Sequence, residues 1–311
     1  MTMVLYDAPG PKARRRSLLI SIVGAIAIAG GLAALIWALG AERVSANGAV
    51  QPGMWDGSRW DIFNDLAVWR SIGEGAAATL RMAAVAAVFA LIIGVLFSFG
   101  RAARSRWVRI PVTIVLEFFR GMPVLLMMLF ILLVFATGSY WAGVAALAVY
   151  NGAIIGEALR AGIQSLPKGQ REAGLSIGLT VLQTRFMIEF PQAFRQMLPI
   201  ILAQMVVLLK DTSLAYIVGY PELLRVGVNY LSNFFGNRYF FSLFFVVLVI
   251  YLAMNLLLSW VARFVARKTG PKAGKLIAAG VDDAGRIPGA SGTRAITLPG
   301  AHGGTIDRRE R

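Results

Sequence analysis

The sequence PKGQREAGLSIGL, residues 167–179, is polar and glycine-bearing and separates two long apolar segments. The chain around it has 311 residues, of which 57% are hydrophobic, and its mean hydropathy is positive. This composition is typical of an integral membrane protein rather than a soluble one. Residues 167–179 are therefore expected to form part of a loop between two membrane spans.

Six apolar runs have the length of about 18 or more residues that a helix needs to cross a membrane core of roughly 30 Å. They are approximately 17–40, 75–99, 112–137, 141–160, 197–219 and 240–265. The sequence thus predicts an all-α integral membrane protein with about six transmembrane helices.

Basic residues cluster at the ends of these runs. They are Lys12, Arg14, Arg15 and Arg16 before the first, Arg101, Arg104, Arg106 and Arg109 after the second, and Arg263, Arg267 and Lys268 after the sixth. The positive-inside rule then puts both termini in the cytoplasm, with 1–16 a cytoplasmic segment and 41–71 an external loop. The net charge of +15 is explained by this pattern, because the basic residues do not form one face with interleaved aromatics for nucleic acid.

Both ends of the chain carry features that need a separate interpretation. The segment 17–40 is either a cleaved signal peptide or a retained anchor, and its length favours the anchor. From residue 266 the chain loses its apolar periodicity, so 266–311 is predicted to be a disordered cytoplasmic tail. The tail contains GPKAGK at 270–275, but this is one residue short of a phosphate-binding loop and Leu276 replaces the required Ser or Thr.

Residue types that usually carry chemistry are scarce. The chain has no cysteine, and its single histidine, His302, lies in the polar tail. Disulfides and thiolate metal sites therefore cannot form, and His302 is the single residue available for histidine-based catalysis. Neither a metal site nor a catalytic residue is predicted.

The loop 161–196 faces the cytoplasm in this orientation. Pro167 stops the preceding helix, because proline lacks an amide donor and disfavours helix at the residue before it. A short helix is expected to begin near Gln170 and to end at Pro191. Its leucine side (Leu175, Leu179, Leu182 and Phe186) is expected to pack on the chain itself, and a strip formed by Glu172, Gly174 and Gly178 is expected to face another protein. A helix lying on the membrane surface explains the leucines but not Glu172.

The same loop resembles the EAA loop of ABC importer permeases. The pattern consists of Glu172-Ala173-Gly174, then Gly178, nine residues, Ile188, and Phe190-Pro191. Gly174 and Phe190 replace the usual alanine and leucine, and both keep the small or apolar character of the position. In that family the loop is a coupling helix that docks on the ATP-hydrolysing subunit, so the resemblance implies a coupling role for Glu172, Ala173, Gly174, Gly178 and Pro191.

Four further segments are similar to the polar amino-acid subfamily of these permeases. They are 117–126 (EFFRGMPVLL), 152–174 (GAIIGEALRAGIQSLPKGQREAG), 190–199 (FPQAFRQMLP) and 208–219 (LLKDTSLAYIVG). The resemblance covers about 72–265 and implies a five-helix MetI-like core, to which 17–40 adds an extra N-terminal span. The opening VLYDAPGPKARRR, 4–16, resembles actinobacterial glutamate-uptake permeases.

Charged residues inside spans are costly, at about 2.5–3.5 kcal/mol each. In the third span Glu117 and Arg120 either pair with each other or line a pathway, and Gly121 and Pro123 are expected to break the helix after them. Glu157 and Arg160 are expected to form a structural pair.

The fifth span carries its polar residues at Lys210, Asp211, Thr212 and Ser213, about midway across. They either contact substrate or make a structural ion pair with a neighbouring helix. With Arg120 they are the predicted substrate-pathway residues.

The predicted function is that of a permease subunit of an ATP-driven importer for a polar amino acid, most simply glutamate, without catalytic residues or cofactors of its own. The resemblance implies an ATPase pair that binds ATP and Mg, a second permease that is identical or related, and an external substrate-binding protein. Aspartate, glutamine or arginine as substrate, an ion-gradient-driven transporter or channel, and a membrane enzyme remain the alternatives. Gradient-driven transporters usually show inverted repeats, which are not apparent here.

Overall fold

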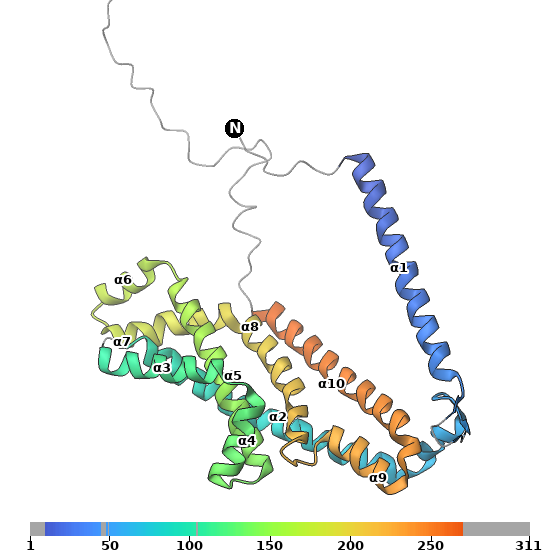
Figure 1. Ribbon diagram of the computed structural model, residues 1–311. Helices are drawn as coiled ribbons and strands as arrows, with labels where there is room; N and C mark the ends of the chain where they lie inside the picture. The colour runs from blue at the N-terminus through green and yellow to red at the C-terminus, as the bar shows by residue number, and fades with distance from the viewer. Residues whose placement is uncertain (1–9, 45–47, 49, 104, 270–311) are drawn as a thin grey trace, which may run out of the picture. The chain divides into compact units, whose positions relative to one another are not determined.

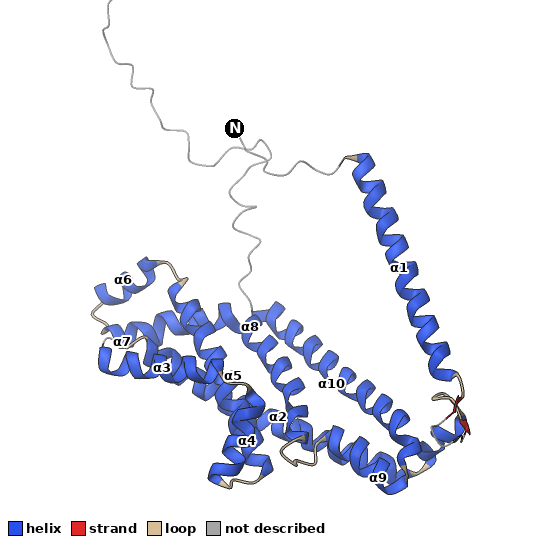
Figure 2. Cartoon of the chain, in the orientation of Figure 1, coloured by secondary structure: helices blue, strands red, loops and turns tan. Residues whose placement is uncertain are grey.

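The computed structural model describes residues 10–44, 48, 50–103 and 105–269, and these are helical almost throughout (Figures 1 and 2). The α-helices are α1 Pro11–Gly40, α2 Leu66–Arg101, α3 Arg106–Gly121, α4 Val124–Phe135, α5 Ser139–Gln164, α6 Lys168–Ser176, α7 Val181–Thr184, α8 Phe190–Asp211, α9 Leu231–Phe235 and α10 Phe240–Thr269. The predicted all-α class is confirmed. The predicted tail 266–311 begins too early, because 266–269 form the last turn of α10. The rest of it, 270–311, lies outside the described residues, as does the segment 1–9.

Short elements connect the helices. The 3₁₀ turns are η1 Gly57–Arg59, η2 Asp61–Asn64, η4 Thr212–Tyr216 and η6 Asn237–Tyr239, and the π-helical turns are η3 Arg185–Glu189 and η5 Arg225–Tyr230. Two strands, β1 Arg43–Val44 and β2 Val50–Gln51, pair antiparallel within the predicted external loop. This small hairpin was not predicted, because two-residue strands leave no periodic pattern in the sequence.

Within the described residues, five helical segments are long and apolar enough to cross a membrane: Pro11–Gly40, Leu66–Arg101, Ser139–Gln164, Val181–Tyr216 and Asn237–Lys268. The predicted third span is instead the pair α3 and α4, bent by 106°, which makes a sixth if it is counted as one. Met122 is extended (ψ 129°) because it precedes Pro123, so the predicted break is confirmed. The 12 residues of α4 extend only about 18 Å, which is too short to cross the membrane alone.

Helices α2 and α5 approach each other closely through small residues. A Cβ atom added at Gly156 of α5 would lie 2.8 Å from the Cβ of Phe97 and 3.0 Å from the backbone oxygen of Gly94 on α2. Gly152, one turn earlier, meets Ile93 in the same way, at 2.7 Å. Such stripes let helix backbones pack tightly in a membrane, where van der Waals contact drives association. The main apolar core extends from this pair to α4 and α8.

Helix α2 begins at Leu66, inside the stretch that was predicted as loop. Asp65 caps it by accepting a hydrogen bond from the Ala67 amide (2.8 Å), and Val68 and Ile72 are buried in a second apolar cluster with Leu223 and residues of α10. Tryptophans of the predicted external loop form an aromatic cluster near these residues, in which Trp55 and Trp60 stack at 6.1 Å. Both rings also contact Phe245 of α10.

The expectation that Pro191 ends a helix is wrong. Pro191 lies in the first turn of α8, and the helical run continues from Val181 to Tyr216. Proline lacks one amide donor, which is tolerated at the start of a helix. The π-helical turn η3, in which the Phe190 amide donates to the Arg185 carbonyl, directly precedes Pro191 and accommodates the irregular backbone.

Candidate functional site

The loop that resembles the EAA pattern folds into two short helices rather than one. Pro167 precedes α6, as predicted, and α6 ends after nine residues at Ser176. Gly178 then adopts a positive φ of 84°, which glycine enters without steric cost, and the chain turns toward α7. A capping box starts α7: the Thr180 amide donates to the Gln183 side chain at 2.8 Å, and the Gln183 amide donates to the Thr180 hydroxyl at 3.3 Å.

The strip that was expected to face another protein is only partly exposed: Glu172 and Gly178 are on the surface, but Gly174 is not. Gly174 is buried, and a Cβ atom there would lie 2.6 Å from Cγ2 of Thr184 and 3.0 Å from Cδ1 of Ile188. Gly174 therefore faces the chain's own α7 and η3, not a partner. The leucine side packs on the chain only in part: Leu179 is half-buried and the Phe186 ring stacks on Phe99 of α2 at 4.9 Å. Leu175, Leu182 and Phe186 are still 40%, 66% and 58% exposed. The error arose because a glycine strip does not reveal which helix it packs against.

The remaining residues of the predicted coupling set are on the surface. Glu172 and Ala173 are exposed on α6, and Gly178 and Pro191 are exposed at the turn and at the start of α8. In the described part of the chain the Glu172 side chain makes no ion pair. The structure thus leaves a carboxylate and a group of apolar side chains together on one exposed segment.

Arg185 holds this segment on the helix bundle. Its guanidinium donates to the backbone oxygen of Ala102, at the end of α2, and lies 3.6 Å from the carboxylate of Glu189. The end of the bundle where α2 and α5 finish and α6 and α7 attach is called the α6 end below. The other end, where α8 finishes and α10 begins, is called the α9 end.

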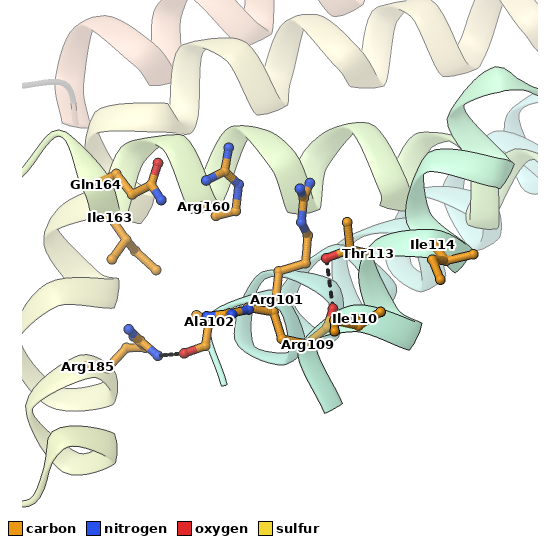
Figure 3. Close-up of a pocket in the computed structure, with 10 residues that line it drawn as sticks. All are labelled: Arg101, Ala102, Arg109, Ile110, Thr113, Ile114, Arg160, Ile163, Gln164 and Arg185. Carbon is orange, nitrogen blue, oxygen red and sulfur yellow. Dashed lines mark hydrogen bonds between the residues drawn. The ribbon is translucent and has the colours of Figure 1, made fainter. Parts of the chain in front are cut away.

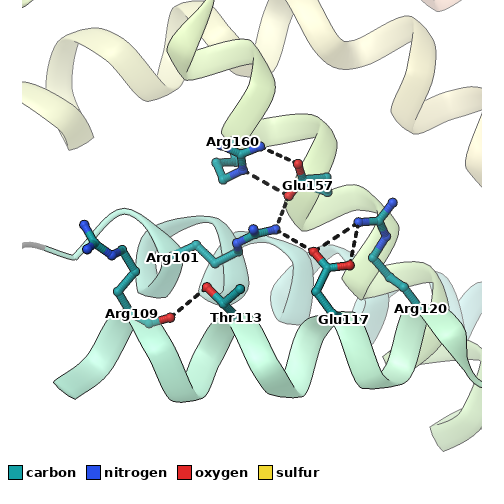
Figure 4. Close-up of polar contacts among 7 residues, drawn as sticks. All are labelled: Arg101, Arg109, Thr113, Glu117, Arg120, Glu157 and Arg160. Atoms are coloured by element: carbon teal, nitrogen blue, oxygen red, sulfur yellow. Dashed lines mark hydrogen bonds and ion pairs between the residues drawn. The ribbon is translucent and has the colours of Figure 1, made fainter. Parts of the chain in front are cut away.

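A cluster of arginines and glutamates joins three helices at the α6 end (Figure 4). Arg101 of α2 pairs with Glu157 of α5 and, at 3.3 Å, with Glu117 of α3. Glu157 also accepts from Nε of Arg160 at 3.0 Å, which confirms the predicted structural pair. Glu117 pairs with Arg120 at 3.2 Å, so of the two alternatives for these residues the structure has the ion pair.

Lys210, Asp211, Thr212 and Ser213 lie at the end of α8 and the start of η4, not within a continuous α-helix. Lys210 is exposed and Asp211 is half-buried. Thr212 is fully buried, and its hydroxyl donates to the Leu209 carbonyl at 2.6 Å, while the Ser213 hydroxyl donates to the Lys210 carbonyl at 2.9 Å. Both hydroxyls thus satisfy the end of their own helix and keep only acceptor capacity for a ligand.

Arg120 is not brought together with these four residues within the chain. Asn151 of α5 and Gln204 of α8 are hydrogen-bonded at 2.7 Å and mark the same level in two antiparallel helices. Glu157, in the cluster that contains Arg120, is six residues from this level, and Lys210 is six residues from it in the other direction. At 1.5 Å per residue the two groups are roughly 18 Å apart along the helix axes.

Two buried polar groups were missed from the sequence. Asn151 is fully buried and binds both Gln204 and the Leu147 carbonyl (2.8 Å), so it fixes α5 against α8. Glu222 is also fully buried and caps the helix that begins at Leu223: its carboxylate accepts from the Leu224 and Arg225 amides (2.9 and 2.7 Å) and from the Tyr251 hydroxyl (2.5 Å). An Asn in an apolar run and the Pro-Glu pair before a helix were the available signals.

The family follows from comparison of the sequence with known proteins. The model of the binding-protein-dependent transport system inner membrane component matches residues 88–271, more than half of the chain. The chain belongs to this family. The match includes the α6–α7 segment, the cluster of arginines and glutamates, and Lys210–Ser213.

Individual relatives of the chain are permeases for amino acids. The chain is 37% identical over 199 residues to the glutamate transport system permease protein GluD of Corynebacterium glutamicum, covering 59% of this chain and 73% of the relative. It is 34% identical over 164 residues to the probable glutamine ABC transporter permease GlnP of Bacillus subtilis (49% and 72%), and 31% identical over 161 residues to the arginine permease ArtQ of the same organism (49% and 72%).

Solved structures agree with this assignment. An amino acid ABC transporter crystallised with histidines is similar at a TM-score of 0.58 and 25% identity, over 64% of this chain and 94% of that one. The inward-facing MetNI methionine transporter shares the fold at a TM-score of 0.56 and 20% identity, over 66% and 99%. The chain is thus a multi-pass ABC-transporter permease of the amino-acid group, with α1 as the extra N-terminal span. An ion-gradient-driven transporter and a membrane enzyme are no longer alternatives.

Proposed function

We propose that this chain is the permease subunit of an ATP-driven importer that moves glutamate into the cell. It works with a pair of ATPase subunits that bind ATP and Mg, a second permease, and an external substrate-binding protein. The glutamate assignment is supported by the likeness to GluD, which extends over more of this chain than the likeness to the glutamine and arginine permeases.

The distribution of basic residues supports the orientation of the importer. Basic residues gather at the α6 end. Helix α2 ends with Arg101, α3 begins with Arg106, and Arg185 binds the end of α2. The last turn of α10, which runs toward this end, carries Arg267 and Lys268. By the positive-inside rule the α6 end faces the cytoplasm. The same rule puts the start of α1 in the cytoplasm, because it carries the remaining basic cluster, Lys12 to Arg16. The end of α10 lies there too, because it carries Arg267 and Lys268. Both termini are therefore proposed to face the cytoplasm.

The exposed α6–α7 segment is the observation that carries the coupling proposal. Isolated apolar side chains on a surface are ordinary, but Leu175, Ile177, Leu182 and Phe186 lie close together in sequence, with exposed fractions from 40% to 75%. Glu172 supplies a charge with no partner in the described chain. Such a surface fits a groove on the ATPase that offers apolar contacts and one cationic group.

Attachment of the segment to the bundle explains how movement is transmitted. Gly174 packs against Thr184, and Arg185 binds the end of α2, so a force on α6 reaches α2 and α8 through packed contacts. When ATP closes the ATPase pair, α6 moves with it and shifts the two permeases between inward- and outward-facing states. Glu172, Ala173, Gly178 and Pro191 lie on the docking side, whereas Gly174 holds α6 in place.

Replacing Glu172 by alanine tests the coupling proposal. Glu172→Ala should abolish ATP-dependent uptake while membrane insertion and the amount of protein stay normal, because the exposed side chain makes no ion pair within the described residues. Glu42→Ala, the same change at an exposed glutamate in the loop before α2, is the matched control and should retain uptake. Normal uptake by Glu172→Ala would reject the coupling role.

The substrate pathway is proposed to pass the end of α8. Exposed Lys210 can attract a carboxylate and half-buried Asp211 can accept the amino group of the same amino acid, with the Thr212 and Ser213 oxygens as further acceptors. Arg120 is proposed to act nearer the cytoplasm. Lys210→Gln should raise the KM for glutamate, and an unchanged KM would remove Lys210 from the pathway.

Radiolabelled uptake identifies the substrate. Cells that lack this gene, with and without a plasmid copy, are compared for glutamate uptake with glutamate, aspartate, glutamine and arginine as unlabelled competitors. We expect loss of glutamate uptake in the deletion strain and strongest competition by glutamate itself. Unchanged glutamate uptake in the deletion strain, with loss of glutamine or arginine uptake, would replace the glutamate assignment.

A further inference from the structure

A basic cavity of about 510 Å³ lies at the α6 end of the bundle (Figure 3). Four of its lining residues are arginines from four separate elements: Arg101 of α2, Arg109 of α3, Arg160 of α5 and Arg185 of η3. These positions extend from 101 to 185 in the sequence, and the packing of α2, α3, α5 and η3 brings them together. The coupling role proposed above uses the bond between two lining residues, Arg185 and Ala102, but it assigns no ligand to the cavity.

The charges around the cavity do not balance. Five arginines, Arg120 and the four above, are opposed by three carboxylates, Glu117, Glu157 and Glu189. Within the described residues Arg109 pairs with none of the three, and in Figure 4 its guanidinium points away from Glu117. The cavity therefore keeps an excess of positive charge, which attracts an anion.

The other lining residues are apolar or neutral. Ile110 and Ile114 of α3 and Ile163 of α5 add apolar surface to the lining, and Thr113 and Gln164 add hydrogen-bonding groups. Ile110 is 51% and Ile114 64% exposed on α3, and neighbouring Trp107 is 91% exposed. A basic helix with exposed tryptophan and isoleucine is typical of a membrane interface. A ligand with an anionic head and an apolar chain matches this mixed basic and apolar lining.

We propose that this cavity binds the phosphate of an anionic phospholipid, with the guanidinium groups around the phosphate and an acyl chain along Ile110 and Ile114. Arginine suits this role because its planar group presents several donors to phosphate oxygens. Basic pockets between transmembrane helices bind lipid headgroups in this way. The occupied site would tie the end of α2 to α3 next to the α6–α7 segment. This inference does not depend on the identity of the transported amino acid.

Lipid binding is measured by native mass spectrometry of the full-length chain in detergent. The probes are phosphatidylglycerol, phosphatidylcholine with the same acyl chains, and inorganic phosphate. We expect one phosphatidylglycerol to be retained more tightly than phosphatidylcholine. Arg109→Gln should weaken its binding on the order of fivefold, the loss expected for one basic residue near an anionic headgroup.

Arg106→Gln is the matched control. Arg106 carries the same charge on the same helix, but it does not line the cavity. Both arginines are exposed, so neither substitution should impair folding, which a thermal melt verifies. Equal binding of the two lipids, or an equal loss in Arg106→Gln and Arg109→Gln, would overturn the proposal. Displacement of phosphatidylglycerol by an equal concentration of inorganic phosphate would also overturn it, because the site would then recognise a free anion. No ATPase or substrate is present, so the outcome is separate from that of the transport experiments.

Discussion

Replacement of Gly156 by alanine should destabilise the permease by wedging α2 and α5 apart. The added Cβ would lie 2.8 Å from the Phe97 Cβ and 3.0 Å from the Gly94 backbone oxygen. Carbon atoms attract best at about 3.5–4.0 Å, so the contact is short by roughly 1 Å. Both neighbouring atoms are fixed to the α2 backbone, so no change of rotamer relieves the overlap.

The expected magnitude follows from the two ways in which the chain can respond. Keeping the helices in place retains a steric clash, and separating them by 0.5–1 Å loses about a quarter to a half of the dispersion energy along the contact. Overpacking of this kind typically costs about 1–3 kcal/mol. The gain of about 1 kcal/mol from replacing a helical glycine by alanine acts in the opposite direction.

Gly73→Ala isolates the packing effect. Gly73 is exposed within α2, and a Cβ atom there would meet no described atom within 4 Å. The helix-propensity gain is common to both variants, so the unfolding free energies of Gly73→Ala and Gly156→Ala should differ by the packing cost of about 1–3 kcal/mol. Thermal unfolding of the purified chain in one detergent, followed by tryptophan fluorescence, measures the difference. Equal midpoints would refute the claim that close α2–α5 contact stabilises the bundle.

Three further predictions concern other elements. Burial raises the pKa of Glu222 despite its hydrogen bonds from Tyr251 and two amides, so the folded chain holds the proton more tightly and stability should fall as pH rises from 4.5, the ordinary pKa, upward. Glu222→Gln should flatten this pH dependence of the melting temperature. An unchanged slope would contradict the claim that the buried Glu222 carboxyl causes it. Glu157→Gln should lower the unfolding free energy by about 1–3 kcal/mol, because Arg101 and Arg160 lose their shared acceptor, and an unaltered melting temperature would show that the cluster is not structural. Gly178→Ala should cost about 1 kcal/mol at its positive φ and speed amide hydrogen exchange in α6, and unchanged exchange would exclude strain at this turn.

Much of the fold was predictable because its signals are local. The length of the apolar runs sets the number of spans, and Pro167 and Pro123 end helices through their own covalent geometry. The pairing of Glu157 with Arg160 was equally predictable, since residues three apart on a helix are neighbours. The change from α8 to the 3₁₀ turn η4 after Asp211 was not predictable, because the apolar run continues through it.

The sequence by itself determined the membrane class, the helix break after Gly121 and the presence of a polar segment between the fourth and fifth spans. Only the tertiary structure decided that Gly174 faces inward, that Arg101 reaches two helices and that Arg109 lines a basic cavity. Hydrophobicity and backbone geometry act along the chain and leave a periodic pattern, whereas these contacts depend on which helices meet and at what distance. The stretch 167–179 encodes a helix and a turn, but the packing of α7 against Gly174 sets the face that is offered to a partner.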